Sequence, residues 1–272
     1  MAFHENEFSG ENAVQFGQLS FRDGVIKVPA GTNTDGIKVT KQVQVVSGFL
    51  TKIQKRTNES DEYGVSESMT MYFHDNTAIS FTFATDQKVN YRAAHLMAKL
   101  LAASAGENGF AEEVFIRMGI SRKGEVMPDG KKLETDNVWS SVRCPALSNE
   151  PLRGYYGQGM EGLPDTPVQM NANGQPIMNG KHAVRDHTNL YAWVQGAAEY
   201  LIAKADETAE VNRQRGKQQR AQQEATANQH MNDGINPAEL AGVDQAVNHQ
   251  NQGNGFQAPN GQQAQAPQRP RF

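Results

Sequence analysis

The chain has 272 residues, a net charge of -4 and a hydrophobic fraction of 38% without Gly, compared with roughly 45–50% in globular domains when Gly is included. No apolar run reaches the roughly 18 residues that a transmembrane helix needs, and residues 1–20 lack the apolar core of a secretory signal. A single cysteine, Cys144, excludes an internal disulfide and a multi-cysteine zinc site. These features favour an intracellular protein with one folded part and one polar, unfolded part.

The chain begins with a segment that we expect to be flexible, residues 1–19, and then reads as β-strands. Residues 24–28 form a short run of β-branched side chains that predicts a strand. Residues 37–56 are rich in Val, Thr and Ile and predict a long strand. Gly48 lies in the middle of this run, where a glycine marks a bulge or a bend, as at the corner of a barrel.

A polar segment and a hairpin follow the long strand. Residues 57–68 carry four acids and no clear alternation, so we expect a loop there. Apolar and polar residues then alternate over 69–74 and again over 79–83, with Asp75 and Asn76 between the two runs. This pattern predicts a hairpin with one apolar and one polar face.

The second half of the chain mixes helices, strands and one long loop. Apolar residues at helical spacing predict a helix over about 90–104 and a last helix over about 188–210. Between them, alternation predicts strands at 114–120 and 137–144. Residues 145–187 are rich in Gly and Pro and predict a long irregular loop, of the kind that is often functional.

The C-terminal part of the chain has a different composition. Residues 205–272 contain 14 Gln and 8 Asn, and their only aromatic residues are Phe256 and Phe272. Such a segment cannot bury enough apolar surface to offset the entropy of ordering. We therefore expect residues 206–272 to form a disordered tail.

The order of the expected elements predicts an α+β fold. Three or four strands precede a helix, two strands follow it, and a C-terminal helix closes the folded part. This order suits a small antiparallel β-barrel or sheet of the OB type, whose helix lies between the third and fourth strands. We expect this OB-like domain to span residues 20–205, although other α+β folds fit the same order.

Motifs of enzyme and metal sites are weak in this sequence. Residues 157–162 match Gly-x-Gly-x-x-Gly, but the Pro-containing segment that follows cannot open the helix that a dinucleotide site requires. His182 and His187 are five positions apart in the expected loop, which is not a metal-ligand spacing. Cys144 lies at the end of an expected strand before Pro145, where we expect a packed thiol rather than a nucleophile. We expect no catalytic residue, no metal and no cofactor.

Basic and aromatic residues instead gather on the expected strand faces and the loops beside them. Single-stranded nucleic acid is bound by cations that follow the phosphates and by flat side chains that stack on bases. The candidate phosphate ligands are Lys52, Arg56, Arg117, Arg122, Lys123 and Arg143. The candidate stacking residues are Tyr72, Trp139, Tyr155 and Tyr156.

Structural interpretations of these residues stay open. Trp139 can belong to the core, as strand aromatics usually do. Lys52 and Arg56 can form a solvated edge that prevents aggregation. Tyr155 and Tyr156 can simply pack the long loop onto the domain. The acid-rich segment 59–67 would repel phosphate unless it points away from the binding face.

One stretch of the sequence resembles a known class of protein. The segment 45–56, with Gly48 and the basic exit at Lys52, Lys55 and Arg56, followed by a polar loop and the run 69–75, resembles the first hairpin of OB-type binders of phage single-stranded DNA. In length and layout, over roughly residues 20–205, the chain is similar to the single-stranded-DNA-binding RNA polymerase cofactors (Drc) of schitoviruses.

The resemblance implies a role in phage transcription in the cytoplasm of the infected host cell. There the protein would hold promoter single strands open with little sequence specificity, and its tail would contact a phage RNA polymerase. The tail ends in Arg-Pro-Arg-Phe, whereas replicative binders of the bacterial type end in an acidic tip with a final Phe. This departure counts against recruitment of host replication enzymes.

Two alternative functions stay open at this point. The chain can be a replication or recombination protein that binds single-stranded DNA and uses its tail to contact a replication protein. It can also be a structural protein of the virion, which predicts large assemblies and no affinity for DNA. We expect no membrane partner, and the sequence leaves self-association open.

Overall fold

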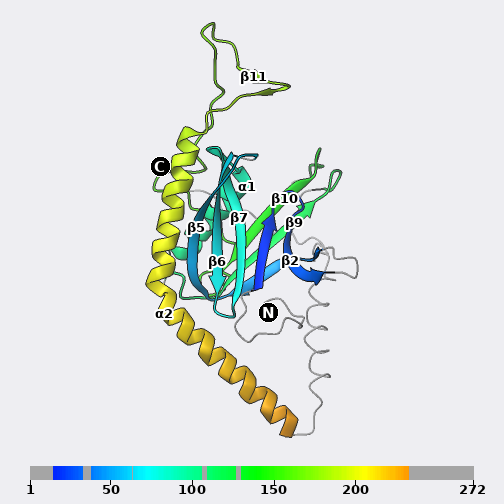
Figure 1. Cartoon of the computed structure of the whole chain (residues 1–272), viewed down its shortest axis with the longest axis vertical. Coiled ribbons are helices and arrows are strands. Elements are labelled where there is room, and N and C mark those ends of the chain that lie inside the picture. The colour runs from blue at the N-terminus through cyan, green and yellow to red at the C-terminus, as the bar shows by residue number, and fades with distance from the viewer. Residues whose placement is uncertain (1–14, 33–37, 63, 106–108, 127–129, 233–272) are drawn as a thin grey trace, which may run out of the picture. The chain divides into compact units, whose positions relative to one another are not determined.

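The computed structural model of the chain describes residues 15–32, 38–62, 64–105, 109–126 and 130–232 (Figure 1). Contacts divide the chain into two units, residues 1–218 and 219–272. The first unit contains every described strand, the first helix and most of the second. Of the second unit, only the end of that helix is described.

Seven strands form the larger sheet of the first unit. Their order is β3-β2-β1-β7-β6-β5, and β8 pairs with β7. Only β1 and β7 run parallel; the other neighbours are antiparallel. The strands are β1 (Gln15–Ser20), β2 (Val25–Thr32), β3 (Lys38–Val43), β5 (Leu50–Ser60), β6 (Gly64–Phe73), β7 (Thr77–Thr85) and β8 (Lys88–Val89).

Three strands form a second sheet, in the order β10-β9-β4. They are β4 (Val45–Gly48), β9 (Val114–Ser121) and β10 (Asn137–Arg143). Only Phe49 separates β4 from β5, so the chain passes from one sheet into the other at Gly48. A Cβ on Gly48 would lie 3.2 Å from Nδ1 of His74, and a larger residue would crowd this corner. The predicted bend at Gly48 is confirmed.

Several strand boundaries differ from the prediction. The expected strand 37–56 is divided into β3, β4 and β5. The expected loop 57–68 is instead the far end of the β5–β6 hairpin. Its polar residues continue the strand pairing, for example Asn58 with Ser66. Residues 15–19, expected to be flexible, belong to β1, which pairs with β2 and β7. Short polar strands carry too little apolar alternation to be recognised.

The predicted barrel is not closed by the described strands. The sheet orders leave β3 and β10 as end strands, and β1 occupies the edge of β7 to which a closing strand would pair. The two sheets still approach each other at the β1–β2 turn, where a Cβ on Gly24 would lie 2.6 Å from the carbonyl oxygen of Gly119. The fold is therefore α+β, with two mostly antiparallel sheets and two helices.

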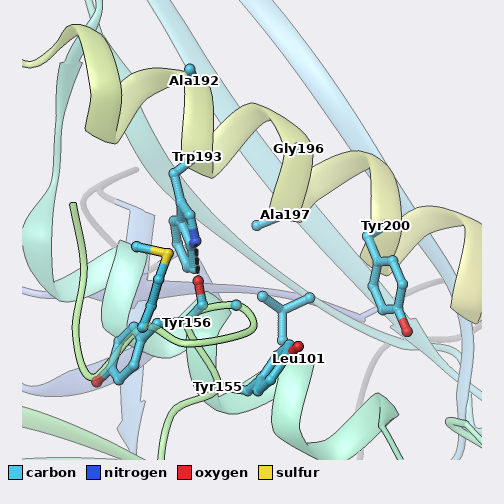
Figure 2. Close-up of a pocket in the computed structure, with 10 residues that line it drawn as sticks. Leu101, Tyr155, Tyr156, Ala192, Trp193, Gly196, Ala197 and Tyr200 are labelled. Carbon is cyan, nitrogen blue, oxygen red and sulfur yellow. Dashed lines mark hydrogen bonds between the residues drawn. The ribbon is translucent and has the colours of Figure 1, made fainter.

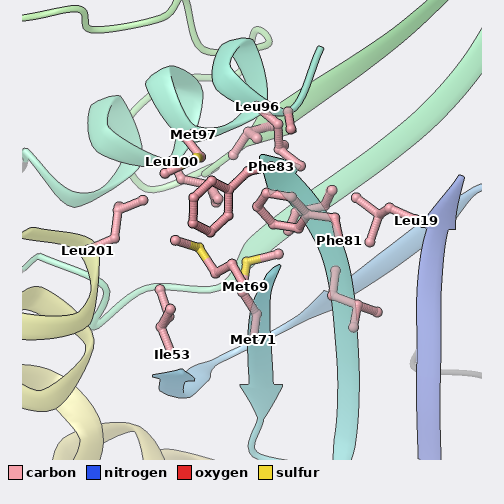
Figure 3. Packing of buried hydrophobic residues seen from close by; sticks show 14 of the residues in the cluster. Leu19, Ile53, Met69, Met71, Phe81, Phe83, Leu96, Met97, Leu100 and Leu201 are labelled. Atoms are coloured by element: carbon pink, nitrogen blue, oxygen red, sulfur yellow. The ribbon is translucent and has the colours of Figure 1, made fainter. Parts of the chain in front are cut away.

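The first helix, α1 (Tyr91–Ser104), covers the core between the sheets. Oδ1 of Asn90 accepts hydrogen bonds from the backbone N–H groups of Arg92 and Ala93 and so caps the helix. Figure 3 shows the helix packing on the inner face of β6 and β7. The side chains that meet there include Met69, Met71, Phe81, Phe83, Leu96, Met97 and Leu100. The predicted amphipathic helix is confirmed.

The second helix, α2 (Thr188–Asn232), is longer than the sequence predicted. Nδ2 of the buried Asn212 donates to the carbonyl oxygens of Leu50 at 2.5 Å and of Phe110 at 2.7 Å. Gly216 then lets the helix pass His74 closely, because a Cβ there would lie 2.6 Å from the imidazole side chain. Residues 206–232, expected to be disordered, are therefore helical. The rest of the predicted tail, 233–272, lies outside the described residues.

The long Gly/Pro-rich segment before α2 contains a small β structure. Strands β11 (Met178–Asn179) and β12 (His182–Ala183) pair with each other, and isolated bridges join Val168 to Arg185 and Met170 to Pro176. We call residues 168–185 the arm. Its side chains from 169 to 182 are all exposed, so the segment expected to be irregular is partly a solvent-facing β ribbon.

Candidate nucleic-acid interface

One face of the larger sheet is mostly polar, and its side chains are exposed or half-buried except for the buried Thr70 and Ala78. Successive side chains of a strand point to opposite faces, and the inner face carries the buried residues of the core. The outer face, which we call the polar sheet face, carries Phe16, Gln18, Lys52, Gln54, Arg56, Ser68, Thr70, Tyr72, Ser80 and Thr82. None of these ten positions is acidic, so the cations there meet no opposing charge from the face itself.

One row of side chains across this face brings a cation and two aromatic rings together. The row crosses β5, β6, β7 and β1. Lys52 pairs in register with Tyr72, Tyr72 with Ala78, and Ala78 with Phe16. Nζ of Lys52 lies 5.9 Å from the centroid of the Tyr72 ring. The Phe16 and Tyr72 rings meet edge to face, 6.3 Å apart, over the small Ala78. Phe16 is exposed, which leaves an aromatic surface open to solvent.

Hydrogen bonds fix the Tyr72 ring in place. Nη2 of Arg56 donates to the Tyr72 hydroxyl at 3.2 Å, and this hydroxyl donates to Oε1 of Gln54 at 3.3 Å. Arg56 uses one of its five N–H donors in this hydrogen bond. The other donors can bind phosphate while the phenol stays oriented. Thus Lys52, Arg56 and Tyr72, all predicted site residues, lie together.

Two acidic residues of the β5–β6 hairpin, Glu59 and Glu67, lie away from the polar sheet face, whereas Asp61 and Glu62 lie in its exposed turn. Glu59 and Glu67 alternate with Asn58 and Ser68 and therefore belong to the opposite face. Nζ of Lys55 lies 3.2 Å from Oε1 of Glu67, and Nε2 of Gln195 in α2 donates to Oε2 of Glu67 at 2.8 Å. This cluster fastens the helix to the inner face of the sheet.

The second sheet carries a basic and aromatic patch of its own, formed by Phe115, Arg117, Trp139 and Arg143. Cζ of Arg117 lies 5.6 Å from the Trp139 ring. The indole lies across Gly119, where an added Cβ would fall 2.2 Å from Trp139 Cζ2. Trp139 is half-buried rather than part of the core, so the structure favours the surface interpretation. We call these four residues the Trp139 patch.

Of the remaining predicted cations, Arg122 is paired with a carboxylate, whereas the Lys123 side chain has no such partner within the described residues. Nη1 of Arg122 lies 2.9 Å from Oδ2 of Asp136, and the backbone N–H of Lys123 donates to Oδ1 of Asp136 at 2.8 Å. These contacts, first that of Lys123 and then that of Arg122, hold the pKa of Asp136 below its ordinary value. The carboxylate therefore stays charged and neutralises Arg122, whereas the Lys123 side chain is exposed.

The last two predicted stacking residues lie among the helices instead. Tyr156 shares a hydrogen bond of 3.2 Å with Nδ1 of His95 in α1, and its carbonyl oxygen accepts from Trp193 Nε1 of α2 at 2.8 Å. Figure 2 shows Trp193, Tyr155, Tyr156 and Tyr200 around a shallow pocket of about 360 Å³. We call this pocket the aromatic groove. The packing interpretation holds for Tyr156, and neither tyrosine joins the sheet site.

The cysteine and histidines that the sequence analysis considered for catalysis or metal binding lie in surroundings that do not favour those roles. Burial raises the pKa of the Cys144 thiol, which opposes formation of a nucleophilic thiolate. His187 accepts a hydrogen bond from the backbone N–H of Val89 at 3.4 Å, and His182 lies in the arm. Within the described part of the chain, no three His, Cys, Asp or Glu side chains gather as a metal site would require.

Two residues of these surfaces escaped the sequence analysis. Phe16 lies in a segment of weak alternation that was expected to be flexible. Trp193 lies among helix residues whose apolar face was assigned to packing. No local sequence pattern marks either residue as part of a surface site, because the residues around them come from strands and helices that are distant in the sequence.

Comparisons with known proteins complete the description. A scan against protein-family models gives no match, and searches of curated proteins and of solved structures give no match either. No helix of the described residues combines the length and apolar character needed to span a membrane. The functional interpretation therefore depends on the geometry of the two sheet surfaces.

Proposed function

We propose that this protein binds single-stranded DNA with little sequence preference through the polar sheet face, aided by the Trp139 patch. The observation that carries the proposal is the row formed by Lys52, Tyr72 and Phe16. It presents the exposed Phe16 ring and the half-buried Tyr72 ring beside cations, and none of the named positions of the face is a carboxylate. Exposed rings suit unstacked bases, and lysine or arginine beside them suits the phosphates.

The chemistry of the face favours single strands over duplex. Bases in a duplex already stack on each other, so the rings of Tyr72 and Phe16 can engage them only after unpairing. The hydrogen-bonding side chains of the face are mainly Ser, Thr and Gln, which accept several arrangements of partners. Binding is therefore expected to depend on salt, through release of counterions, more than on base sequence.

The order of the elements also supports the proposal. When the N-terminal strands β1–β3 and the short β8 are set aside, β4–β5, β6 and β7 precede α1, and β9 and β10 follow it, as in an OB fold with its helix after the third strand. In that fold the face of the second and third strands binds oligonucleotides; here these strands are β6 and β7. We propose that the chain is an open OB-like variant, in which the N-terminal hairpin β1–β2 lies beside β7.

The biological setting of the proposal comes from the resemblance to phage transcription cofactors. In that setting, the polar sheet face would hold the single strands of opened promoter DNA in the infected cell. Residues 233–272 would then contact a phage RNA polymerase. A replication role uses the same DNA-binding face and differs in the protein partner.

Fluorescence anisotropy with labelled oligonucleotides tests the proposal. The full chain and a chain that ends at Asn232 are titrated against single-stranded and duplex DNA of equal length. We expect both chains to prefer single strands and to lose affinity as salt rises. Absence of single-strand binding by the full chain would overturn the proposal and favour a structural role in the virion.

A further inference from the structure

The aromatic groove is an apolar surface that stays open among the described residues of the chain. Tyr155, Tyr200 and Met160 are 49%, 46% and 41% exposed, and Leu101 and Ala197 form its buried floor. Figure 2 shows the rings of Tyr155 and Tyr200 on either side of this floor. Several large apolar side chains exposed together mark a contact surface rather than random surface composition.

The arm presents a complementary apolar face. Met170 bridges to Pro176, and Met178 pairs with Ala183. Because cross-strand partners and alternate residues share a face, these four side chains lie on one face of the ribbon. Met170 and Met178 are 56% and 54% exposed. A ribbon this small buries little by itself, so its methionines remain available to a partner.

The charges of the two surfaces also differ in sign. The arm carries Lys181, Arg185 and His182 and no carboxylate within residues 168–185, although Asp165 and Asp186 flank it. Beside the groove, exposed Glu161 and Glu199 adjoin Met160 and Tyr200 in sequence. Lys204 lies over the Tyr200 ring but pairs with Glu207, so the carboxylates of the rim outnumber its cation. The arm is therefore basic, and the rim of the groove is acidic.

We propose that the arm of one copy docks its Met170–Met178 face into the aromatic groove of a second copy. Methionine side chains adapt to irregular apolar surfaces and make favourable sulfur–aromatic contacts, here with Trp193, Tyr155 and Tyr200. Lys181 and the groove glutamates supply complementary charges at the rim. Since arm and groove are different surfaces, two copies can exchange arms in a reciprocal dimer, or several copies can join head-to-tail in a ring or an open chain.

This inference goes beyond the proposed function, because it does not require DNA. Sedimentation velocity of the full chain without DNA, over two decades of concentration, tests it directly. We expect assembly with rising concentration for the natural sequence. The arm variant Met170→Asp with Met178→Asp and the groove variant Tyr200→Asp should each stay monomeric, whereas Val126→Asp, at another exposed apolar residue, should assemble normally.

A mixture of the two defective variants gives the sharpest outcome. The arm variant retains an intact groove, and the groove variant retains an intact arm, so only one productive contact can form between them. We expect the mixture to give a heterodimer and no larger species. A natural chain that stays monomeric, or arm and groove variants that assemble as the natural chain does, would overturn the inference; circular dichroism confirms that each variant is folded.

Discussion

The polar sheet face and the aromatic groove each place a lysine over a tyrosine ring, yet they differ in what surrounds the cation. Lys52 lies 5.9 Å from the Tyr72 ring, and Lys204 lies 5.8 Å from the Tyr200 ring. Nζ of Lys204 is also 2.7 Å from Oε2 of Glu207, whereas the outer face around Lys52 has no carboxylate. A cation beside an aromatic ring is therefore not enough to indicate a nucleic-acid site; the lack of a local counter-charge distinguishes the two regions.

Reversal of the unpaired cations should have the largest effect. We expect Lys52→Glu with Arg56→Glu to lower the affinity for single-stranded DNA about 100-fold, because two phosphate contacts are lost and repulsion replaces them. The matched control is Lys204→Glu with Arg213→Glu. It makes the same change in charge at cations that already pair with carboxylates. Anisotropy titrations in low salt compare the two, and equal losses would erase the distinction between the regions.

Removal of one aromatic ring from each region should have the next largest effect, and it should change DNA affinity only at the polar sheet face. Tyr72→Ala is expected to weaken binding about tenfold, in line with the roughly 1–3 kcal/mol that stacking contributes per base. Tyr155→Ala removes an exposed ring from the aromatic groove and should leave the affinity unchanged. If Tyr155→Ala weakens binding as much as Tyr72→Ala, the DNA path includes the helices as well as the sheets.

The two tryptophans offer an optical comparison of the same regions. Trp139 lies beside Arg117 on the second sheet, and Trp193 lines the aromatic groove. We expect single-stranded DNA to quench the fluorescence of the Trp193→Phe variant, which retains Trp139. The Trp139→Phe variant should show little change. The opposite pattern would place DNA at the groove.

The smallest predicted effect concerns the inner face of β5 and the pH dependence of folding. Burial opposes the ionisation of Glu67, but hydrogen bonds from Tyr191, Gln195 and Lys55 outweigh it and hold the pKa of Glu67 below its ordinary value. Ionised Glu67 therefore stabilises the folded chain at neutral pH, and this contribution is lost as the pH falls through the lowered pKa.

Urea unfolding at neutral and acidic pH measures this contribution. We expect Glu67→Gln to lower the free energy of unfolding at neutral pH by about 1 kcal/mol and to reduce its decline toward acidic pH. DNA affinity should remain that of the natural chain, because Glu67 lies on the opposite face. If the free energy of unfolding of Glu67→Gln depends on pH as that of the natural chain does, Glu67 is not the source of the pH dependence.

Local patterns predicted much of the fold and part of the site. Alternation predicted the β6–β7 hairpin, helical spacing predicted α1, and Gly48 predicted the bend between the sheets. Period-two spacing placed Lys52 and Arg56 on one face, with Lys55 on the other. These features depend on neighbours in sequence, and the structure confirms them.

The remaining features depend on contacts between distant segments. β1 is recognisable only through its pairing with β7. The extension of α2 depends on Asn212, which bonds the distant carbonyls of Leu50 and Phe110. Tyr155 and Tyr156 were candidates for stacking at the start of the long loop, with packing onto the domain left open, because the sequence of a loop does not indicate which helices it contacts. Composition likewise predicted disorder where tertiary contacts support a helix.

The salt dependence of single-strand binding tests the central claim most directly. Each phosphate contact on a single strand contributes a slope of about -0.7 to the plot of log affinity against log salt concentration. The account predicts that Lys52→Gln with Arg56→Gln makes this slope shallower by about 1.4, whereas Lys204→Gln with Arg213→Gln leaves it unchanged. An unaltered slope in the first variant would contradict the assignment of the polar sheet face as the DNA-binding surface.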